Sequence, residues 1–448
     1  MSHPVHKFLK KIEERKITVC IVGLGQVGLP TALLFADAGF TVTGHDINEK
    51  IIHTLNAGRC HFNEPGLNAL LSQCIAKKRF RATSDFPRAL KESDVVIICV
   101  ATPLGSNNRP NLDFLKNACG MIAKNPLKDK LVVIESSIPP GTTRNLVVPI
   151  LRRNRHALGK DFWVVYIPER LAPGQAIEEI ARTARIIGSY DATGAEMARA
   201  LYKNVIKNDI VVTDVNVAET SKLVENTYRD VNIAFANETA KICESLGIDI
   251  MEVIRVANTH PRVHVHTPGV GVGGPCIPKD PHLLISPVGG KELDLKVIPQ
   301  AREVNDSMPE HFTDQVEKAL LRGKKRISGA SVLCLGVTYK GNVSDTRDSP
   351  AQAVIQALRV RGAEVSAYDP ISTDVFGAKR VKTLSEGIKQ ADAVLILTDH
   401  DEFKKLDWKK VGRQLKKSAI LADGRRIVPQ DAAKALKDRF IAVGYGTR

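Results

Sequence analysis

Short runs of apolar, often β-branched residues alternate along the chain with longer segments in which apolar positions recur at helical spacing. In the first 170 residues the clearest runs lie at 17–22, 94–100, 131–135 and 164–167. Continuous apolar runs of this length are typical of strands whose two faces are both covered by helices. The pattern therefore predicts an α/β fold built on a doubly wound parallel sheet.

A second set of strand and helix patterns follows residue 330. Its expected strands lie at 331–336, 364–368, 393–397 and 419–422, with a helix at 350–361. Between the two sets, residues 214–246 contain no Pro or Gly and predict one long helix, and 291–325 form a charged helical connector. We therefore expect two Rossmann-like doubly wound domains joined by a long central helix. The expected domain boundaries are 1–210, 211–310 and 311–448.

A glycine-rich turn joins the first expected strand to the helix that follows. The turn is followed by a second strand at 41–44, which ends at Asp46. This order matches the G-x-G-x-x-G fingerprint of dinucleotide-binding units, in which the acid binds the ribose and the helix N-terminus meets the pyrophosphate. An aspartate at this position favours NAD over NADP. The candidate cofactor-binding residues of the turn are Gly23, Gly25, Gln26, Val27 and Gly28.

The stretch 268–280 combines four glycines with reactive side chains. Cys276 comes directly after the glycines, and Lys279 and Asp280 follow within four residues. Glycines let a backbone approach a ligand closely, and a nearby ammonium favours the nucleophilic thiolate. A flexible surface loop with an incidental cysteine explains this stretch alone equally well.

Further candidate residues lie just past strand ends or on the long helix. Thr102, Ser137 and Glu169 follow expected strands of the first half, at the edge where ligands bind in such sheets, although turn or capping roles are the simpler alternative. Lys222 and Asn226 lie on one face of the long helix. That face is mostly polar, and the opposite face is too apolar for a free helix, so periodicity alone does not say which side packs.

Three cations lie just beyond the strand ends of the second half, where they could neutralise phosphates. They are Lys340, Arg347 and Arg425. For an isolated arginine a solvated position is the simpler interpretation, whereas three equivalent positions favour anion binding.

Composition narrows the class of protein. The formal net charge of +15 suits nucleic acids or anionic small molecules, but Lys and Arg are spread along the chain and no nucleic-acid-binding motif is present. The eight cysteines include no C-x-x-C pair, which argues against a disulfide framework and a zinc site; three of them, in apolar runs, are expected in the core. No apolar run is long enough to cross a bilayer, and residues 1–16 lack a signal-peptide core, so we expect a cytoplasmic protein.

Several motifs in one order resemble the nucleotide-sugar 6-dehydrogenases, the UDP-glucose and UDP-N-acetylhexosamine dehydrogenase family. The resemblance covers about 16–426. It rests on Gly23-x-Gly25-x-x-Gly28-Leu29-Pro30, Glu64-Pro65-Gly66-Leu67, Ser137-Ile138-Pro139-Pro140-Gly141-Thr142, Pro168-Glu169-Arg170, Glu219-x-x-Lys222-x-x-x-Asn226, Gly273-Gly274-x-Cys276-x-x-Lys279-Asp280 and Asp345-x-Arg347-x-Ser349-Pro350.

The resemblance implies an N-terminal NAD domain, a central helical domain that forms a homodimer or a higher homo-oligomer, and a C-terminal domain that holds the UDP part. It also implies a two-step oxidation at C6 of the sugar, in which Cys276 holds the intermediate as a thiohemiacetal and then a thioester. The implied catalytic residues are Cys276, Lys222, Asn226, Asp280, Glu169 and Ser137. The implied NAD ligands outside the glycine turn are Asp46, Thr102, Ser137, Lys279 and Arg347. The implied substrate ligands are Glu169, Arg170, Leu171, Lys222, Asn226, Arg262, Gly269, Gly273, Tyr339, Lys340 and Arg425.

Three departures from the family pattern bear on the substrate. Pro173 stands where the UDP-glucose branch has a second glutamate, so the Pro-Glu-Arg-x-x-Pro-Gly form resembles the N-acetylhexosamine branch. Lys279 is more typical of the glucose branch, and Ser137 replaces a frequent threonine. We favour UDP-N-acetylmannosamine as substrate, with UDP-N-acetylglucosamine, UDP-N-acetylgalactosamine and UDP-glucose as alternatives.

Three other classes fit less well. An epimerase or dehydratase of the short-chain type needs Tyr-x-x-x-Lys, and no tyrosine here has lysine four residues on. A non-catalytic nucleotide sensor has no need of Cys276, Lys222 and Asp280 together. A simple hydroxyacid dehydrogenase forms one NADH per substrate, whereas the cysteine mechanism forms two.

Overall fold

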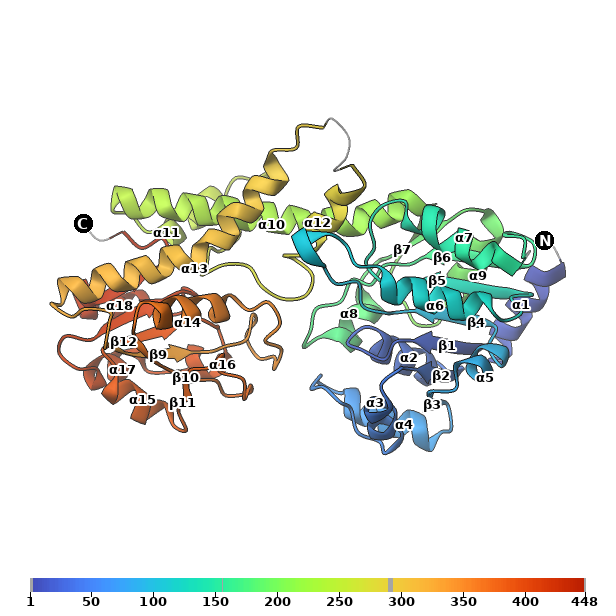
Figure 1. The fold of residues 1–448 in the computed structure, drawn as a ribbon, viewed down its shortest axis with the longest axis horizontal. Coiled ribbons are helices and arrows are strands. Elements are labelled where there is room, and N and C mark those ends of the chain that lie inside the picture. The colour runs from blue at the N-terminus through green and yellow to red at the C-terminus, as the bar shows by residue number, and fades with distance from the viewer. Residues whose placement is uncertain (1–2, 155, 289–292, 447–448) are drawn as a thin grey trace. The chain divides into compact units, whose positions relative to one another are not determined.

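The computed structural model describes residues 3–154, 156–288 and 293–446 and separates into two compact units. Unit 1 comprises Met1–Glu225 with His282–Leu293, and unit 2 comprises Asn226–Pro281 with Asp294–Arg448. Each unit is a sheet covered by helices (Figure 1). The predicted α/β architecture with two doubly wound units and a long central helix is confirmed. The finer division into three domains stays a prediction.

The sheet of unit 1 has eight strands within the described residues. All neighbouring strands pair in parallel except β6 and β7, which are antiparallel. In sheet order the strands are β3 (Phe80–Thr83), β2 (Thr41–His45), β1 (Thr18–Val22), β4 (Val95–Ile98), β5 (Lys130–Ile134), β6 (Phe162–Tyr166), β7 (Arg185–Ser189) and β8 (Ile210–Asp214). The five predicted strands are confirmed, and β3, β7 and β8 were not predicted.

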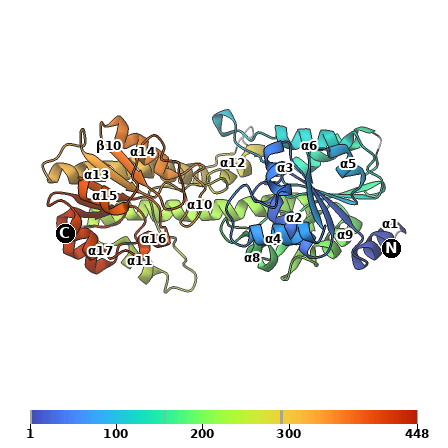
Figure 2. The same ribbon diagram turned by 90° about the horizontal axis from the view of Figure 1, so that it is seen from below.

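Helices cover both faces of this sheet because its strands are apolar on both sides. Val19 and Ile21 of β1 face one buried core, and Cys20 and Val22 face the other. Figure 2 shows α2 and α9 on one side of the sheet and α5 and α6 on the other. The helices are α1 (His3–Glu13), α2 (Gly28–Asp37), α3 (Glu49–Asn56), α4 (Leu67–Ala76), α5 (Phe86–Lys91), α6 (Asp113–Ala123), α7 (Val148–Leu151), α8 (Ala176–Arg182) and α9 (Ala192–Tyr202).

Unit 2 has a parallel sheet with six strands in the part of the chain that is described. In order they are β11 (Lys379–Arg380), β10 (Glu364–Tyr368), β9 (Ser331–Leu335), β12 (Ala393–Ile396), β13 (Ile420–Asp423) and β14 (Phe440–Ala442). The helices around it are α11 (Ile250–Ala257), α13 (Val297–Arg322), α14 (Pro350–Val360), α15 (Leu384–Gln390), α16 (Asp401–Lys404), α17 (Trp408–Gln414) and α18 (Gln430–Leu436). The short helix α12 (Asp280–Ile285) follows the glycine–cysteine loop.

The long helix α10 (Val215–Leu246) buries its polar face and exposes much of its apolar one. Glu219, Asp230 and Asn237 are fully buried, whereas Val224 and Phe235 remain 48% and 57% exposed. The polar face packs inside the chain because other elements supply partners for each of its groups. The exposed apolar side chains of α10 are therefore not covered by the part of the chain that the structure describes.

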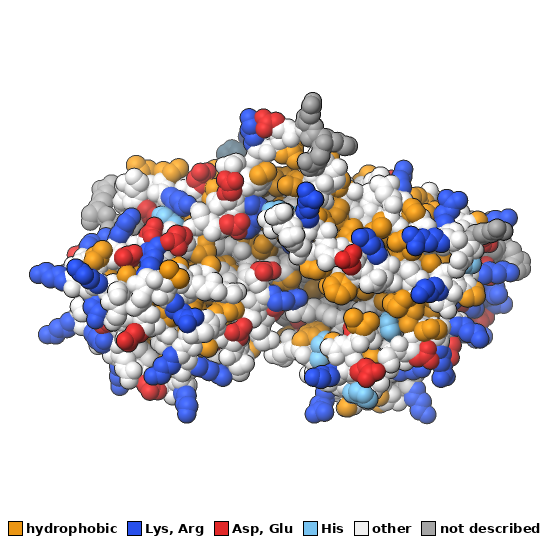
Figure 3. Space-filling view, viewed as in Figure 1, with side chains coloured by type: hydrophobic (Ala, Val, Ile, Leu, Met, Phe, Trp, Pro, Cys, Tyr) orange, Lys and Arg blue, Asp and Glu red, His pale blue; other side chains and the backbone are white. Residues whose placement is uncertain are grey.

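Two expectations from the sequence concern the distribution of basic side chains and the character of the helices. On the face drawn in Figure 3, Lys and Arg side chains are dispersed among acidic and neutral ones. Of the helices that the structure describes, none combines the length and the apolar character that crossing a membrane requires.

Candidate active site

The glycine turn between β1 and α2 has the geometry that a dinucleotide requires. Gly23 has a φ of +94°, and a Cβ on Gly28 would lie 1.9 Å from the Gly23 carbonyl oxygen, so helix and turn are in contact only because both residues are glycine. A Cβ on Gly25 would meet nothing within 4 Å, and Gly25 is exposed. The turn is thus closed at Gly23 and Gly28 and open at Gly25, where a pyrophosphate would approach.

The start of α2 and the acid after β2 complete this turn. Val27 precedes the helix without a side-chain hydrogen bond to its first N–H groups, and Gln26 lies in the same turn. Asp46 accepts hydrogen bonds from the backbone N–H of Leu24 (2.9 Å) and of Asn48 (2.9 Å), which fixes the half-buried carboxylate at the strand end. These residues fit NAD: the helix N-terminus would meet the phosphates and the acid would bind the ribose.

Next to the turn, the ends of β4 and β5 are joined. The Thr102 hydroxyl donates to the Ser137 carbonyl oxygen (2.6 Å), and both residues are buried. The loop after Ser137 is held by Glu219 of α10, whose carboxylate accepts from the backbone N–H of Gly141 (2.5 Å) and of Thr143 (2.8 Å). Burial raises the pKa of Glu219 despite these hydrogen bonds. Glu219 therefore positions the loop that carries Ser137.

Glu169 and Lys222 form a buried ion pair. Lys222 Nζ lies 3.2 Å from Glu169 Oε1, with the two side chains 6% and 8% exposed. Burial by itself would raise the pKa of Glu169, but the Lys222 ammonium and the backbone N–H of Leu171 outweigh it and hold the pKa below its ordinary value. The structure thus brings together three of the predicted site residues of unit 1, with Glu169 ionised.

The loop after Glu169 is fastened by another acid. Buried Glu64 accepts from the backbone N–H of Gly174 (2.8 Å) and of Ala176 (2.8 Å), the residues that open α8. This contact explains the Glu64 motif in structural terms.

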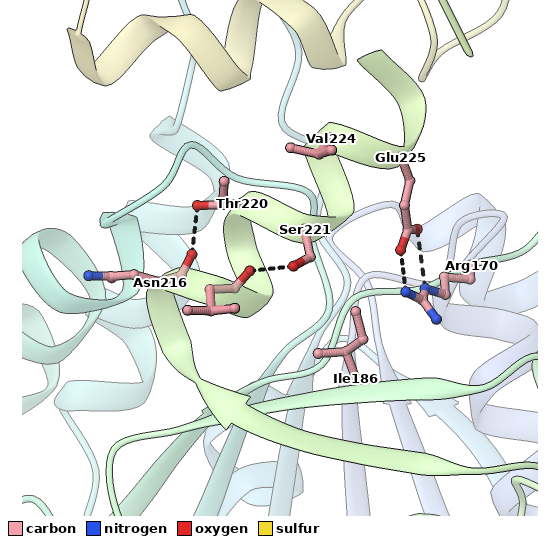
Figure 4. Close-up of a pocket in the computed structure, with 8 residues that line it drawn as sticks. Arg170, Ile186, Asn216, Thr220, Ser221, Val224 and Glu225 are labelled. Carbon is pink, nitrogen blue, oxygen red and sulfur yellow. Dashed lines mark hydrogen bonds and ion pairs between the residues drawn. The ribbon is translucent and has the colours of Figure 1, made fainter. Parts of the chain in front are cut away.

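Arg170 turns away from Glu169. Its guanidinium pairs with Glu225 and donates to the Ala184 carbonyl oxygen (2.8 Å), and it lines a surface hollow beside the start of α10 (Figure 4). The hollow has a volume of about 600 Å³ and is bordered by Val217 and Val224. The structure gives Arg170 a partner within the protein, and its role toward substrate stays a prediction.

In unit 2, Asn226 and Asp280 are in contact. The Asn226 amide donates to Asp280 Oδ2 (2.6 Å), and Asp280 is fully buried. The Cys276 carbonyl accepts from the backbone N–H of Lys279 (3.1 Å) and of Asp280 (2.8 Å), and Lys279 Nζ lies 3.9 Å from Asp280 Oδ1. One tight turn therefore fixes the lysine and the aspartate beside the half-buried Cys276.

The glycines before Cys276 pack against Tyr339. A Cβ on Gly273 would lie 2.9 Å from Tyr339 Cβ, and one on Gly274, whose φ is +89°, would lie 2.7 Å from the tyrosine ring. Arg347 donates a hydrogen bond to Asp345, and this bond raises the pKa of Arg347. The negative charge of a Cys276 thiolate also raises the pKa of Arg347. A cation therefore lies within electrostatic reach of the sulfur.

Of the remaining predicted substrate ligands of unit 2, Gly269 and Arg425 lie close together. Gly269 is buried, its N–H donates to Asn237 Oδ1 (2.9 Å), and a Cβ on it would lie 3.4 Å from the Arg425 guanidinium. Lys340 is half-buried in the loop after β9. Arg262 is exposed, and its role toward substrate stays a prediction.

Comparison with known proteins decides the family. Three models of the UDP-glucose/GDP-mannose dehydrogenase family match in chain order: the NAD binding domain at 17–206, the central domain at 216–307 and the UDP binding domain at 333–430. This chain belongs to the UDP-glucose/GDP-mannose dehydrogenase family. It is an NAD-dependent nucleotide-sugar dehydrogenase, and its cofactor is NAD.

Relatives and solved structures from this family cover almost all of the chain. The UDP-N-acetyl-D-mannosamine dehydrogenase of Pyrococcus horikoshii is 40% identical over 92% of this chain and 96% of its own, and a solved structure of that enzyme matches with a TM-score of 0.90 at 38% identity, over 96% of this chain and 100% of its own. The NDP-N-acetyl-D-galactosaminuronic acid dehydrogenase of Ralstonia nicotianae is 36% identical over 87% and 92% of the two chains. A UDP-glucose dehydrogenase structure from Pyrobaculum islandicum matches with a TM-score of 0.87 at 28% identity, over 96% and 98%.

Several residues that shape this dehydrogenase site were not predicted. Glu64 and Glu219 occur in the family motifs, but the motifs alone assign them no role in holding the loops. Asp399 and His400 follow the end of β12 as Lys340 and Arg425 follow β9 and β13, and the same position could have indicated them.

The two glycines of the turn provide a matched test. Gly28→Ala places a Cβ against the Gly23 carbonyl and should lower the melting temperature of the protein and abolish NAD binding. Gly25→Ala adds a Cβ only to the open space where the pyrophosphate would lie, so it should leave the melting temperature within about 2 °C of wild type while weakening NAD about tenfold or more. Thermal unfolding and NAD titration measure both; equal loss of stability in the two variants would contradict the assignment.

The buried pair makes stability depend on pH in a defined direction. Because the pKa of Glu169 is lowered on folding, its contribution is present above the unfolded value of about 4.3 and is lost as pH falls through the folded value. Glu169→Gln removes the carboxylate that pairs with buried Lys222 and should lower the free energy of unfolding by about 3–5 kcal/mol at pH 7, and by less below pH 4. Urea unfolding at several pH values measures this. Glu178→Gln, which breaks an exposed ion pair with Arg182, should change the free energy of unfolding by less than about 0.5 kcal/mol.

Proposed function

We propose that this dehydrogenase oxidises the C6 alcohol of a UDP-N-acetylhexosamine to the uronate, with UDP-N-acetylmannosamine as the first-choice substrate. The observation that supports the four-electron reaction is the turn at Cys276. A half-buried thiol lies within one turn of Lys279 and Asp280, with Arg347 in electrostatic reach. A two-electron dehydrogenase has no use for a nucleophile in this position.

The thiol carries the sugar between the two oxidations. NAD, when bound, supplies the hydride acceptor for each oxidation. The Cys276 thiolate adds to C6 of the aldehyde-level intermediate and forms a carbon–sulfur bond, giving a thiohemiacetal. Loss of a second hydride leaves a thioester, which water cleaves to the carboxylate and free thiol. For each sugar the reaction consumes two NAD⁺ and one water and forms two NADH and three protons.

The charged residues described above have roles in these steps. Lys222 supplies positive charge for the oxygen on C6 as negative charge develops there, with Asn226 one helical turn further on the same face of α10. Asp280, held by Asn226, accepts a proton from the attacking water, and Ser137 assists in positioning that water. Glu169 contacts the sugar and assists proton movement while it keeps Lys222 in place.

The substrate choice rests on the residues after Glu169 and on the relatives. Pro173 replaces the second glutamate of the glucose branch, and the solved structure of the UDP-N-acetylmannosamine dehydrogenase from Staphylococcus aureus matches with a TM-score of 0.83 at 34% identity, over 95% of this chain and 98% of its own. The mannosamine epimer is therefore the first choice among hexosamines.

The enzyme is proposed to act as a homodimer through α10. The helix exposes an apolar stripe of Val217, Val224, Phe235 and Ile242, each about half exposed. Apolar side chains in a continuous stripe along one helix are typical of a surface that a second subunit covers.

Replacement of the thiol tests the mechanism. Cys276→Ser should bind NAD and UDP-sugar with nearly wild-type affinity but lower steady turnover about 10³-fold or more, because the serine hydroxyl is too weakly acidic to add and be released efficiently. Rapid-quench assays and NADH absorbance measure this. Cys243→Ser, at a buried cysteine of α10, serves as the control. Uronate release by Cys276→Ser near the wild-type rate would contradict the nucleophile assignment.

The amount of NADH formed tests the substrate and the stoichiometry together. With limiting UDP-N-acetylmannosamine the wild-type enzyme should form two NADH per sugar, and kcat/KM should fall for the glucosamine and galactosamine epimers and for UDP-glucose. Absorbance at the endpoint and initial rates over a panel of UDP-sugars give both quantities. One NADH per sugar would exclude the thioester route, whereas two NADH with a different preferred sugar would change only the substrate.

A further inference from the structure

The segment Thr398–Asp399–His400, called here the positioning segment, follows β12 at the carboxyl edge of the second sheet. Its first side chain fixes the start of the loop after β9, because Thr398 Oγ1 donates to the Thr338 carbonyl oxygen (2.6 Å). The contact is close on both sides: a Cβ on Gly336 would lie 2.3 Å from Thr398 Cβ. The loop that carries Tyr339 and Lys340 therefore begins at a fixed point.

His400 fixes the other end of the same loop. The imidazole is fully buried, and its Nδ1 accepts from the backbone N–H of Asn342 (3.1 Å). The acceptor role of Nδ1 assigns the proton to Nε2, which lies 3.0 Å from Asp369 Oδ2 and 3.2 Å from Thr338 Oγ1. Thr338 Oγ1 in turn donates to the Lys340 carbonyl oxygen (2.9 Å). One ring thus contacts both ends of the five-residue loop.

Asp399 holds the second cation of this edge. Its Oδ1 accepts from the Arg425 guanidinium (2.9 Å), and its Oδ2 lies 3.2 Å from Lys404 Nζ. Burial by itself would raise the pKa of Asp399, but Arg425 and Lys404 outweigh it and hold the pKa at about 2. The Asp399 carbonyl also packs against the loop, since a Cβ on Gly341 would lie 2.4 Å from its oxygen. The carboxylate therefore stays charged and paired at any physiological pH.

Asp369, the acid after β10, has the position in unit 2 that Asp46 has in unit 1. In unit 1, the residue after Gly23 donates to Asp46, which is half-buried; in unit 2, Val337 after Gly336 donates in the same way to Asp369 (2.8 Å). Asp369, however, is 6% exposed and also accepts from two further backbone N–H groups and faces His400. In unit 2 the backbone N–H groups and His400 thus occupy the carboxylate whose counterpart in unit 1, Asp46, is expected to bind a ribose.

We propose that the positioning segment fixes Lys340 and Arg425 for the diphosphate of the UDP-sugar. The proposal rests on the proposed function, because the diphosphate is the anion that the two cations would bind. Thr398, Asp399 and His400 act through these cations and do not touch substrate.

The test compares two acids at opposite ends of β12. Asp399 pairs with Arg425 and Lys404 at the carboxyl end, and Asp392 pairs with Lys416 (2.9 Å) and Lys325 (3.2 Å) at the other. Asp399→Asn should raise the dissociation constant for UDP about tenfold, because the Arg425 guanidinium loses its fixed orientation. Asp392→Asn removes the same kind of pair and should leave UDP affinity within about twofold of wild type. Calorimetric titration with UDP measures both variants, and NAD affinity should be unchanged in both.

His400 is tested by a readout that does not need a ligand. His400→Ala should increase hydrogen exchange in 338–342 and weaken UDP about tenfold. His400→Asn places an acceptor near the position of Nδ1 and should restore most of both effects.

The outcomes separate the two proposals. UDP affinity unchanged or tighter in Asp399→Asn, or equal losses in Asp399→Asn and Asp392→Asn, would overturn the role of Asp399. Unchanged exchange in His400→Ala would overturn the role of His400. If wild-type protein fails to bind UDP, the proposed function fails, and increased exchange in His400→Ala still supports the loop-fixing role.

Discussion

The candidate site depends on the burial of charged and polar groups along one face of α10. A charged side chain inside a protein is stable only with a counter-charge or several hydrogen bonds. Lys222 meets this requirement through Glu169, and Glu219 through two backbone N–H groups of the loop after Ser137. Each partner comes from a different element of unit 1. The helix therefore fixes the strand-end loops through the same buried face that holds the lysine, and the chemical role proposed for Lys222 depends on this structural one.

Buried carboxylates that accept pairs of backbone N–H groups recur at these loops. Glu64 holds the loop after Glu169, Glu219 the loop after Ser137, and Asp369 and Asp423 the turns of unit 2. A loop lacks the regular hydrogen bonds of a strand or helix, so its N–H groups need other acceptors when buried. A carboxylate supplies two acceptor atoms in fixed geometry and so imposes one conformation. Precise placement of side chains such as Glu169 follows from this arrangement.

The sequence predicted the elements that follow from apolar periodicity. The buried strands β1, β4, β5 and β12 and the long helix α10 were located within a few residues, as was the glycine turn. The strands β7 and β8 were not found, because β8 exposes Val211 and Val212 and β7 begins with buried Arg185. The side on which α10 packs was also not predictable, since burial of Lys222 and Asp230 depends on partners more than 50 residues away in sequence. Pairings such as Asn226 with Asp280 and Arg170 with Glu225 are likewise long-range and leave no local signal.

The two sheets of this chain show how one backbone design serves two nucleotides. In unit 1 no side chain caps the first turn of α2, in which the Leu29 N–H bonds to the Gly25 carbonyl oxygen (3.1 Å) and Pro30 has no N–H, and Asp46 is half-buried. In unit 2 the corresponding helix α14 begins with Pro350, which has no N–H, and Ser349 accepts from its first N–H groups. In unit 2 the protein's own groups thus occupy both the start of this helix and the acid after β10. Under the proposed function, anion binding in unit 2 would fall to side-chain cations, and a flexible lysine or arginine binds tightly only when its surroundings already fix it.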